Sequence, residues 1–332
     1  MKPALRTLLL LMLFCTLVAA CGGATAPSSQ ASQGAGTATP VAKTGSLSTS
    51  FQLSGLVKQP ATVTLSNLQR FSKVTVSVNV KPLGAHTFGG ALLYDVLQLA
   101  GITTQSARKN DLLRKSIMVS GTDGYTVAVA WGEIDPQFAN KKILLAYEED
   151  GKDLPQSDGF ARLIVPGDGL AGRYVSNVAS VLVRDPGVFP TLSTRQPTQA
   201  FFLTGLVNTP AKYTLTELQA LKTTTVTVQG TTYSGILLND LLQQAGLQLK
   251  PKKNDFLHKG IVAIGSDGYS CVIEDGEIDP RFGNIQVLVA TAMNGQALPN
   301  SDGFARIIVP GDQKMGRFVS NLQELQVVEL AS

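Results

Sequence analysis

Apolar and polar side chains alternate along residues 73–80 (KVTVSVNV), and this period of two predicts a half-buried β-strand. Residues 92–100 (LLYDVLQLA) instead repeat their apolar positions at helical spacing. They are followed by Gly101, a residue that favours the left-handed cap at a helix C-terminus. Residues 237–245, followed by Gly246, repeat this pattern. The chain therefore mixes strands with helices of two or three turns.

Turn and cap residues extend this picture. Asp123-Gly124 and Asp267-Gly268 each stand between two apolar runs and predict hairpin turns. Thr214 and Glu217 have the spacing of a capping box that opens a short helix. Residues 143–147 and 163–166 are apolar runs that predict further strands. Strands in runs with a few short helices indicate an α+β fold with a mixed sheet.

The chain contains two copies of one unit, found by comparing the sequence with itself. The motif GEIDP at residues 132–136 recurs at residues 276–280, and SDGFAR at 157–162 recurs at 301–306. Further matches occur in the same order along both copies. The copies span residues 50–184 and 200–332, called repeat 1 and repeat 2 below. Residues 185–199 contain prolines and predict a linker. We expect two domains, packed as a pseudo-symmetric pair.

The N-terminus predicts export and a lipid anchor. Residues 1–20 begin with Lys2 and Arg6 and continue with an apolar run too short to span a membrane comfortably, as in a secretory signal. The run ends in VAAC, which resembles a bacterial lipobox, so that Cys21 would carry the lipid. Residues 21–49 are rich in Gly, Ala, Ser and Thr and predict a flexible spacer. The alternative is a plain signal peptide that ends near a cysteine.

Charge and cysteine content exclude several function classes. The formal net charge of +4 falls to +2 when Lys2 and Arg6 are removed with the signal, and no basic run suggests a nucleic-acid partner. Of the three cysteines, Cys15 leaves with the signal and Cys21 is the expected lipid site. Cys271 alone cannot form an internal disulfide. It lies in an expected strand, where a small buried residue is the best interpretation.

The order of several short motifs resembles the molybdopterin-binding oxidoreductase domain of the sulfite oxidase family. These motifs are an aromatic-x-G-x-L element before a helix, D-G-Y, L-P, G-x-x-R, V-P-G and G-R-[YF]-V. In repeat 1 they include residues 88–92, 123–125, 154–155 and 172–175. The resemblance covers both repeats and implies two tandem copies of a sulfite oxidase-like domain, with mixed sheets and short helices.

The chain departs from this family at the metal ligand. The resemblance implies a molybdenum-binding cysteine between the alternating strand and the aromatic-x-G element. That interval is residues 72–87 in repeat 1 and 223–232 in repeat 2, and neither contains cysteine. Thiolate is the ligand type that a soft, redox-active metal requires. We therefore expect no bound cofactor, although the resemblance leaves molybdopterin open as the alternative.

Anion binding is the function that such domains could retain. By resemblance, the region of the G-x-x-R and G-R motifs lies near the pterin phosphate. Arginines beside glycine-rich loops can bind phosphate or another anion. The candidates are Arg162, Arg173, Arg306 and Arg317. The interpretation we favour is that these arginines pair with local acids, among them Asp158, Asp168, Asp302 and Asp312.

Other candidate chemistry is weaker. The pairs Glu133/Asp135 and Glu277/Asp279 precede or include an Asp-Pro step, which often forms an N-cap and first helical residue. The histidines occupy non-equivalent positions, which predicts no metal site and no hydrolase triad. Residues 148–150 (EED) read as a solvated loop.

The sequence therefore predicts an extracytoplasmic protein, anchored to a membrane by the lipid on Cys21, that binds a small anionic ligand or an envelope protein without catalysis. Two alternatives remain: a molybdopterin-dependent oxidoreductase of the sulfite oxidase family, and a purely structural envelope component.

Overall fold

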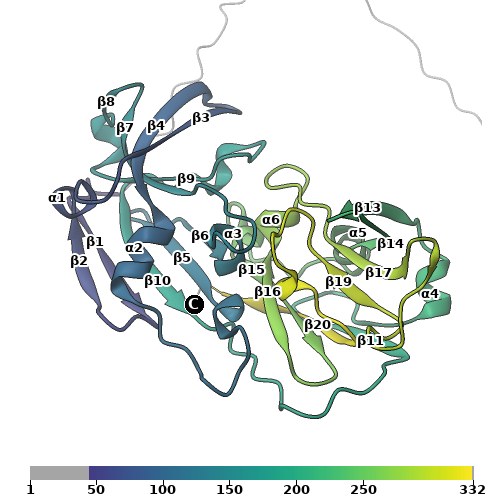
Figure 1. The fold of residues 1–332 in the computed structure, drawn as a ribbon. Helices are drawn as coiled ribbons and strands as arrows, with labels where there is room; N and C mark the ends of the chain where they lie inside the picture. Colours follow the sequence, from purple (N-terminus) through teal and green to yellow (C-terminus); the bar gives the residue numbers. More distant parts are fainter. Residues whose placement is uncertain (1–44, 331–332) are drawn as a thin grey trace, which may run out of the picture. The chain divides into compact units, whose positions relative to one another are not determined.

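A computed structural model describes residues 45–330 (Figure 1). The expected signal, Cys21 and most of the spacer lie outside these residues. Strands organised in sheets and a few short helices make up the described part, in agreement with the α+β class. Within residues 45–330, no helix has both the length and the apolar character needed to cross a membrane.

Repeat 1 begins with a five-stranded sheet in the order β2-β1-β10-β5-β6. Its strands are β1 (Ser50–Gly55), β2 (Ala61–Thr64), β5 (Ser116–Gly121), β6 (Thr126–Ala130) and β10 (Val178–Arg184). The first and last strands of the repeat, β1 and β10, are parallel neighbours, and the other pairs are antiparallel. The sheet therefore joins the two ends of the repeat.

The second sheet of repeat 1 is antiparallel, in the order β3-β4-β7-β8 with β9 paired to β7. Its strands are β3 (Val74–Val80), β4 (Gly84–Leu92), β7 (Leu144–Glu149), β8 (Lys152–Asp153) and β9 (Arg162–Ile164). The α-helices are α1 (Leu65–Leu68), α2 (Leu93–Ala100) and α3 (Trp131–Ile134). Three 3-10 helices complete the repeat, at Asp111–Arg114, Gln156–Asp158 and Ala171–Arg173.

Repeat 2 has the same two sheets, in the orders β12-β11-β20-β15-β16 and β13-β14-β17-β18 with β19 on β17. The first contains β11 (Ala200–Gly205), β12 (Ala211–Thr214), β15 (Lys259–Gly265), β16 (Ser270–Glu274) and β20 (Leu322–Glu329). The second contains β13 (Thr224–Val228), β14 (Thr231–Leu237), β17 (Leu288–Met293), β18 (Gln296–Ala297) and β19 (Arg306–Ile308). The helices are α4 (Leu215–Gln219), α5 (Leu238–Ala245) and α6 (Asp275–Ile278), with 3-10 helices at Asp255–His258 and Met315–Arg317.

Most local predictions are confirmed. The alternating residues form β3, and the two helical patterns form α2 and α5, each ended by a glycine with φ of +66°. The capping box at Thr214 is present, since Thr214 N donates to Glu217 Oε2 over 2.9 Å. One expectation is wrong. Asp135 does not open a helix but follows the end of α3. Its carboxylate accepts a hydrogen bond from Gln137 N, within the turn that follows α3.

The two repeats pack against each other in pairs of equivalent contacts. Asn110 Nδ2 donates to the Tyr269 hydroxyl over 3.0 Å, and Asn254 Nδ2 donates to the Tyr125 hydroxyl over 2.9 Å. A Cβ on Gly132 would lie 2.5 Å from Arg317 Cδ, so only glycine allows the two repeats to approach this closely. Such reciprocal contacts are typical of an interface with two-fold symmetry. The described residues, 45–330, accordingly form one compact unit.

Candidate functional site

A buried ion-pair cluster lies in each repeat beside this interface. Arg173 is 0% exposed and donates through Nε and Nη2 to both carboxylate oxygens of Asp168, each over 2.7 Å. Its Nη1 donates to Glu133 Oε2 over 2.8 Å. Lys141 adds a second cation, 3.2 Å from Asp168 and 3.8 Å from Glu133. The carboxylate of Glu133 is therefore held by cations and not free for acid–base chemistry.

Repeat 2 has the same cluster without the second cation. Arg317 is 0% exposed, and it donates to Asp312 Oδ2 over 2.8 Å and to Glu277 Oε1 over 2.6 Å. Position 285, which corresponds to Lys141, is an isoleucine. Arg317 also packs across the interface against Gly132. These clusters therefore connect each repeat's own loops to the surface between the repeats.

The different surroundings separate the pKa values of the equivalent glutamates. Burial raises the pKa of Glu133, but the charges of Arg173 and Lys141 outweigh it and bring the pKa below its usual value. Burial raises the pKa of Glu277 to about 7 because Arg317 alone opposes it. Burial also raises the pKa of Asp275 to about 7, with a further contribution from Asp279. The equivalent glutamates therefore differ in direction, with a lowered pKa for Glu133 and a raised pKa for Glu277.

The other two candidate arginines also pair with acids. Arg162 Nη1 donates to Asp158 over 2.9 Å, and Arg306 Nη1 donates to Asp302 over 2.7 Å. The local ion pairs are thus present for all four arginines. Burial leaves Arg173 and Arg317 with no surface for a ligand. Among the four candidates, Arg306 contributes to the pocket described next.

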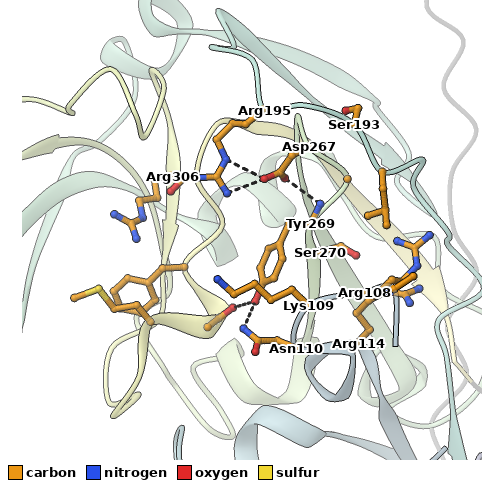
Figure 2. Close-up of a pocket in the computed structure, with 17 residues that line it drawn as sticks. Arg108, Lys109, Asn110, Arg114, Ser193, Arg195, Asp267, Tyr269, Ser270 and Arg306 are labelled. Atoms are coloured by element: carbon orange, nitrogen blue, oxygen red, sulfur yellow. Dashed lines mark hydrogen bonds and ion pairs between the residues drawn. The ribbon is translucent and has the colours of Figure 1, made fainter. Parts of the chain in front are cut away.

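A pocket of about 540 Å³ lies where the two repeats meet the linker, and we call it the junction pocket (Figure 2). It contains five cationic side chains and one carboxylate, Asp267. The cations are Arg108, Lys109 and Arg114 of repeat 1, Arg195 of the linker and Arg306 of repeat 2. The exposed apolar side chains of Leu192 and Met315 also line it. Its size is in the range of small-molecule sites.

Three of these cations already have an acidic partner. Arg195 donates to Asp267, Arg306 to Asp302, and Arg114 to Asp111 over 2.9 Å. Arg108 and Lys109 form no ion pair with any residue in the range 45–330. Within the described part of the chain, Arg108 donates its hydrogen bonds to neutral oxygens, Gln105 Oε1 and the Pro190 carbonyl. The junction pocket therefore has an excess of positive charge, which an anionic ligand would neutralise.

The sequence interpretation missed this pocket because its residues come from three separate segments. The linker residues 192–195 form neither helix nor strand, yet Ser193 N donates to the Asp267 carbonyl over 3.1 Å and Arg195 pairs with the same residue. Proline content predicted the linker but not its packing on repeat 2. No sequence signal connected Arg108 and Lys109 with Arg306, which lies almost 200 residues away.

Both histidines, His86 and His258, lie beside carboxylates, which their non-equivalent positions in the sequence did not indicate. His258 is within 3.5 Å of Asp255 and 2.7 Å of Glu329. Lys259 Nζ lies between the same two acids, at 2.9 Å and 2.7 Å, so a buried ion-pair network explains this cluster. In repeat 1, Arg114 takes the place of His258. His86 lies beside Glu149 and Asp150, so residues 148–150 are not simply a solvated loop.

The intervals expected to carry a metal-binding cysteine form plain hairpins, β3–β4 in repeat 1 and β13–β14 in repeat 2. Among residues 45–330, Cys271 is the one cysteine, and it is 0% exposed in β16 as predicted. Burial raises the pKa of its thiol to about 12, and its Sγ lies 3.7 Å from the Arg317 carbonyl. The described residues therefore offer no thiolate to a metal.

Comparison with known families agrees with the resemblance seen in the sequence. The family described as the oxidoreductase molybdopterin binding domain matches residues 38–175 and 228–331. The chain belongs to this family. The crystal structure of the sulfane dehydrogenase SoxCD from Paracoccus pantotrophus is similar at a TM-score of 0.35 and 14% identity, over 85% of this chain and 78% of that chain. Among curated proteins there is no match.

Family membership implies molybdopterin, but the described residues do not fit it. The resemblance places a molybdenum-binding thiolate at the β3–β4 or β13–β14 hairpin, and neither hairpin contains a cysteine. Arg173 and Arg317, which could contact a pterin phosphate by resemblance, are saturated by buried carboxylates. The donor set around both hairpins is therefore unlike the one that the family's cofactor requires.

Proposed function

We propose that this protein is a lipid-anchored extracytoplasmic binding protein that holds a small organic anion in the junction pocket and has no redox activity. The observation that carries the proposal is the junction pocket itself. It is formed by both repeats and the linker, and two of its five cations have no acidic partner among the described residues.

The location rests on the N-terminal sequence. A basic start, an apolar run and the VAAC segment ending at Cys21 support export and lipidation. The residues that follow, up to position 49, would separate the lipid from the folded repeats. Membrane attachment through Cys21 would place the junction pocket outside the cytoplasm, where it would meet ligands of the envelope or the surroundings.

Two observations support a function without catalysis: the described residues offer no thiolate to a metal, and the arginines of the G-R motifs are buried in ion pairs. Cys271 is buried with a pKa of about 12, and Arg173 and Arg317 hold the protein together instead of facing a cavity. Each repeat retains the fold while its polar residues serve the contact between the repeats. A ligand site between domains is a common way for such a pair to gain a binding function.

Metal and pterin analysis separates this proposal from the oxidoreductase alternative. The full chain, exported by a host that makes molybdopterin, is expected to contain neither molybdenum by plasma mass spectrometry nor released pterin. Near-stoichiometric amounts of both in a folded sample would overturn the non-catalytic proposal and require a metal ligand other than cysteine.

Anion binding can be tested with citrate as the probe. We expect the full chain to bind citrate, and Lys109→Ala and Arg108→Ala each to weaken the affinity by about ten- to a hundredfold, because each removes roughly 1.5–3 kcal/mol of charge-assisted hydrogen bonding. Titration calorimetry at low salt measures both affinities. Lys253→Ala is the matched control, because Lys253 corresponds to Lys109 but does not line the junction pocket.

Equal losses in Lys253→Ala and Lys109→Ala would show a diffuse charge effect and would contradict a site in the junction pocket. Uncharged glucose is expected not to bind. If inorganic pyrophosphate binds and citrate does not, the ligand is a phosphate ester rather than a carboxylate, while the pocket assignment stands.

A further inference from the structure

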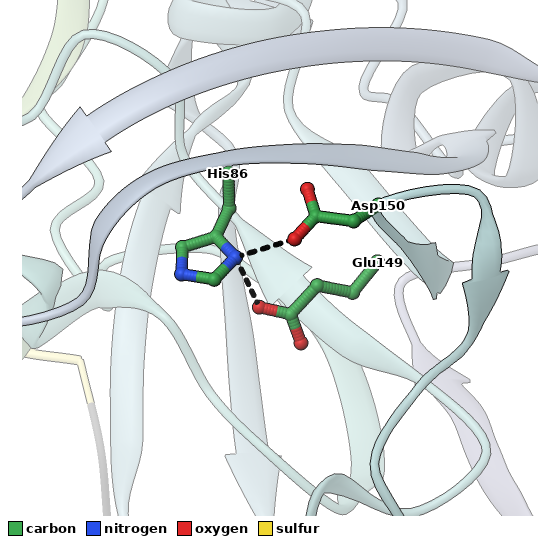
Figure 3. Close-up of side chains that lie close together, drawn as sticks. All are labelled: His86, Glu149 and Asp150. Atoms are coloured by element: carbon green, nitrogen blue, oxygen red, sulfur yellow. Dashed lines mark hydrogen bonds and ion pairs between the residues drawn. The ribbon is translucent and has the colours of Figure 1, made fainter.

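Three metal-ligating side chains meet at one edge of the second sheet of repeat 1 (Figure 3). His86 lies on β4, Glu149 is the last residue of β7, and Asp150 begins the turn to β8. His86 Nδ1 lies 2.9 Å from Asp150 Oδ2 and 3.0 Å from Glu149 Oε1. One ligand atom from each of the three residues lies within 4.8 Å of the others. This cluster is separate from the junction pocket and goes beyond the proposed function.

Repeat 2 shows that the fold does not need these side chains. The register of β14 with β17 places Thr231, Met293 and Asn294 at the equivalent positions. Asn294 Oδ1 accepts from Thr232 N over 3.0 Å, as Asp150 Oδ1 accepts from Thr87 N over 2.8 Å. One side-chain oxygen, from either Asn or Asp, is therefore enough to accept the backbone hydrogen bond of this turn. The second carboxylate oxygen of Asp150, the imidazole and Glu149 form an addition that is present only in repeat 1.

The distances suit a metal ion. Two ligand atoms that are each about 2.1 Å from one metal lie roughly 3.0 Å apart at a right angle and roughly 3.4 Å apart at the tetrahedral angle that zinc prefers. The separations from His86 Nδ1, 2.9 Å and 3.0 Å, lie at the short end of this range. The side chains of His86, Glu149 and Asp150 are 28%, 11% and 54% exposed, so a metal could enter and keep coordination positions open to water.

A simple ion pair explains the arrangement less completely. A protonated imidazole has a single N–H at Nδ1, and its hydrogen bond is to Asp150, so Glu149 would interact with the imidazolium through charge alone. A divalent cation binds a neutral imidazole nitrogen and both carboxylates together, and it neutralises the two negative charges. One imidazole with two carboxylates suits zinc and similar first-row cations better than magnesium or calcium, which prefer oxygen ligands alone.

We propose that His86, Glu149 and Asp150 bind one divalent transition-metal cation of the zinc class. The test uses the full chain without a histidine tag and titrates zinc chloride by calorimetry and by thermal unfolding. Wild type is expected to bind one zinc ion and to gain thermal stability from it. His86→Thr and Asp150→Asn, the residues found in repeat 2, are each expected to weaken binding more than about tenfold.

Glu148→Ala is the matched control, because Glu148 is the neighbouring carboxylate and pairs with Lys73 on the surface, 2.9 Å away. It should leave zinc binding unchanged. The metal-free variants are first checked for native unfolding curves, and Asp150→Asn keeps the turn bond to Thr87.

Three results would overturn the assignment, and the first two are no stoichiometric zinc binding in wild type and unchanged zinc binding in both variants. The second result would move the metal to the His258 cluster. Tighter binding of magnesium than zinc would also contradict it, because carboxylates alone would then account for the affinity.

Discussion

Replacing Arg317 with methionine is expected to lower the free energy of unfolding by about 3–5 kcal/mol, because it leaves two buried carboxylates without a cation. Asp312 and Glu277 are both 3% exposed or less, and both accept hydrogen bonds from Arg317. Methionine fills similar space, so packing against Gly132 is largely kept. Urea denaturation at pH 7 measures the difference.

The equivalent change in repeat 1 provides an internal comparison. Arg173→Met also strips a buried carboxylate pair, but Lys141 remains within 4 Å of both Glu133 and Asp168. We therefore expect a smaller loss than for Arg317→Met. The same urea experiment distinguishes the two, and a loss as large in Arg173→Met would show that Lys141 contributes little.

Two controls separate buried charge from arginine removal in general. Arg195→Met breaks a pair whose arginine side chain is 50% exposed, and such pairs contribute about 1 kcal/mol or less. The triple variant Arg317→Met, Glu277→Gln, Asp312→Asn removes the unpaired charges and should recover much of the lost stability. If Arg317→Met alone were as stable as wild type, the ion pairs of Arg317 with Asp312 and Glu277 would not contribute to stability.

Local structure could be predicted from the sequence wherever a short pattern determines it. Alternation predicted β3, helical spacing and a glycine predicted α2 and α5, and Asp-Gly pairs predicted the β5–β6 and β15–β16 turns. The prediction for Asp135 was wrong because a proline after an acid is equally compatible with a turn that follows a helix. Periodicity could not reveal that β1 pairs with β10, since that contact joins the two ends of the repeat.

The candidate site was only partly predictable. Asp168 and Asp312 are five residues from their arginines, so proximity in the sequence suggested those pairs. Glu133 and Glu277 are 40 residues from theirs, and no short motif connects them. The fully buried state of Arg173 and Arg317 depends on the packing of two repeats, which a single motif does not encode. The partners of His86 lie more than 60 residues away, so its neighbourhood could not be predicted either.

Glu274 is a buried acid between the two repeats, and the same fold forms in repeat 1 without an acid at this position. It is 0% exposed on β16, and its Oε1 accepts a hydrogen bond of 2.6 Å from Ser116 Oγ of repeat 1. Its Oε2 has no partner within residues 45–330. Burial raises the pKa of Glu274 well above its usual value, and the nearby charges of Glu133 and Glu277 add to this. The equivalent residue in repeat 1 is Ala130.

Glu274→Gln is therefore expected to stabilise the protein at pH 8 and to change little at pH 4. A carboxyl whose folded pKa is raised contributes its full stability below the unfolded pKa, and this is lost as the pH rises through the folded pKa. Glutamine mimics the protonated form at every pH and avoids the loss. Each tenfold difference in proton affinity between the folded and unfolded states corresponds to about 1.4 kcal/mol, so the gain at pH 8 increases with the size of the pKa shift. Urea denaturation at pH 4, 6 and 8 measures it.

The loss of stability caused by Glu274 occurs as the pH rises, whereas the loss caused by Glu329 occurs as the pH falls. Burial raises the pKa of Glu329, but hydrogen bonds from Lys250, Lys259 and His258 outweigh burial and lower this pKa to about 2. The stability that Glu329 contributes is therefore lost only as the pH falls. Both proteins should share that acid loss, and the curves of wild type and Glu274→Gln should diverge only above about pH 4.5. Glu148→Gln, at a partly exposed carboxylate paired with Lys73, should show no gain at pH 8. A destabilised Glu274→Gln at pH 8 would mean that the ionised carboxylate is the form that the interface between the repeats stabilises.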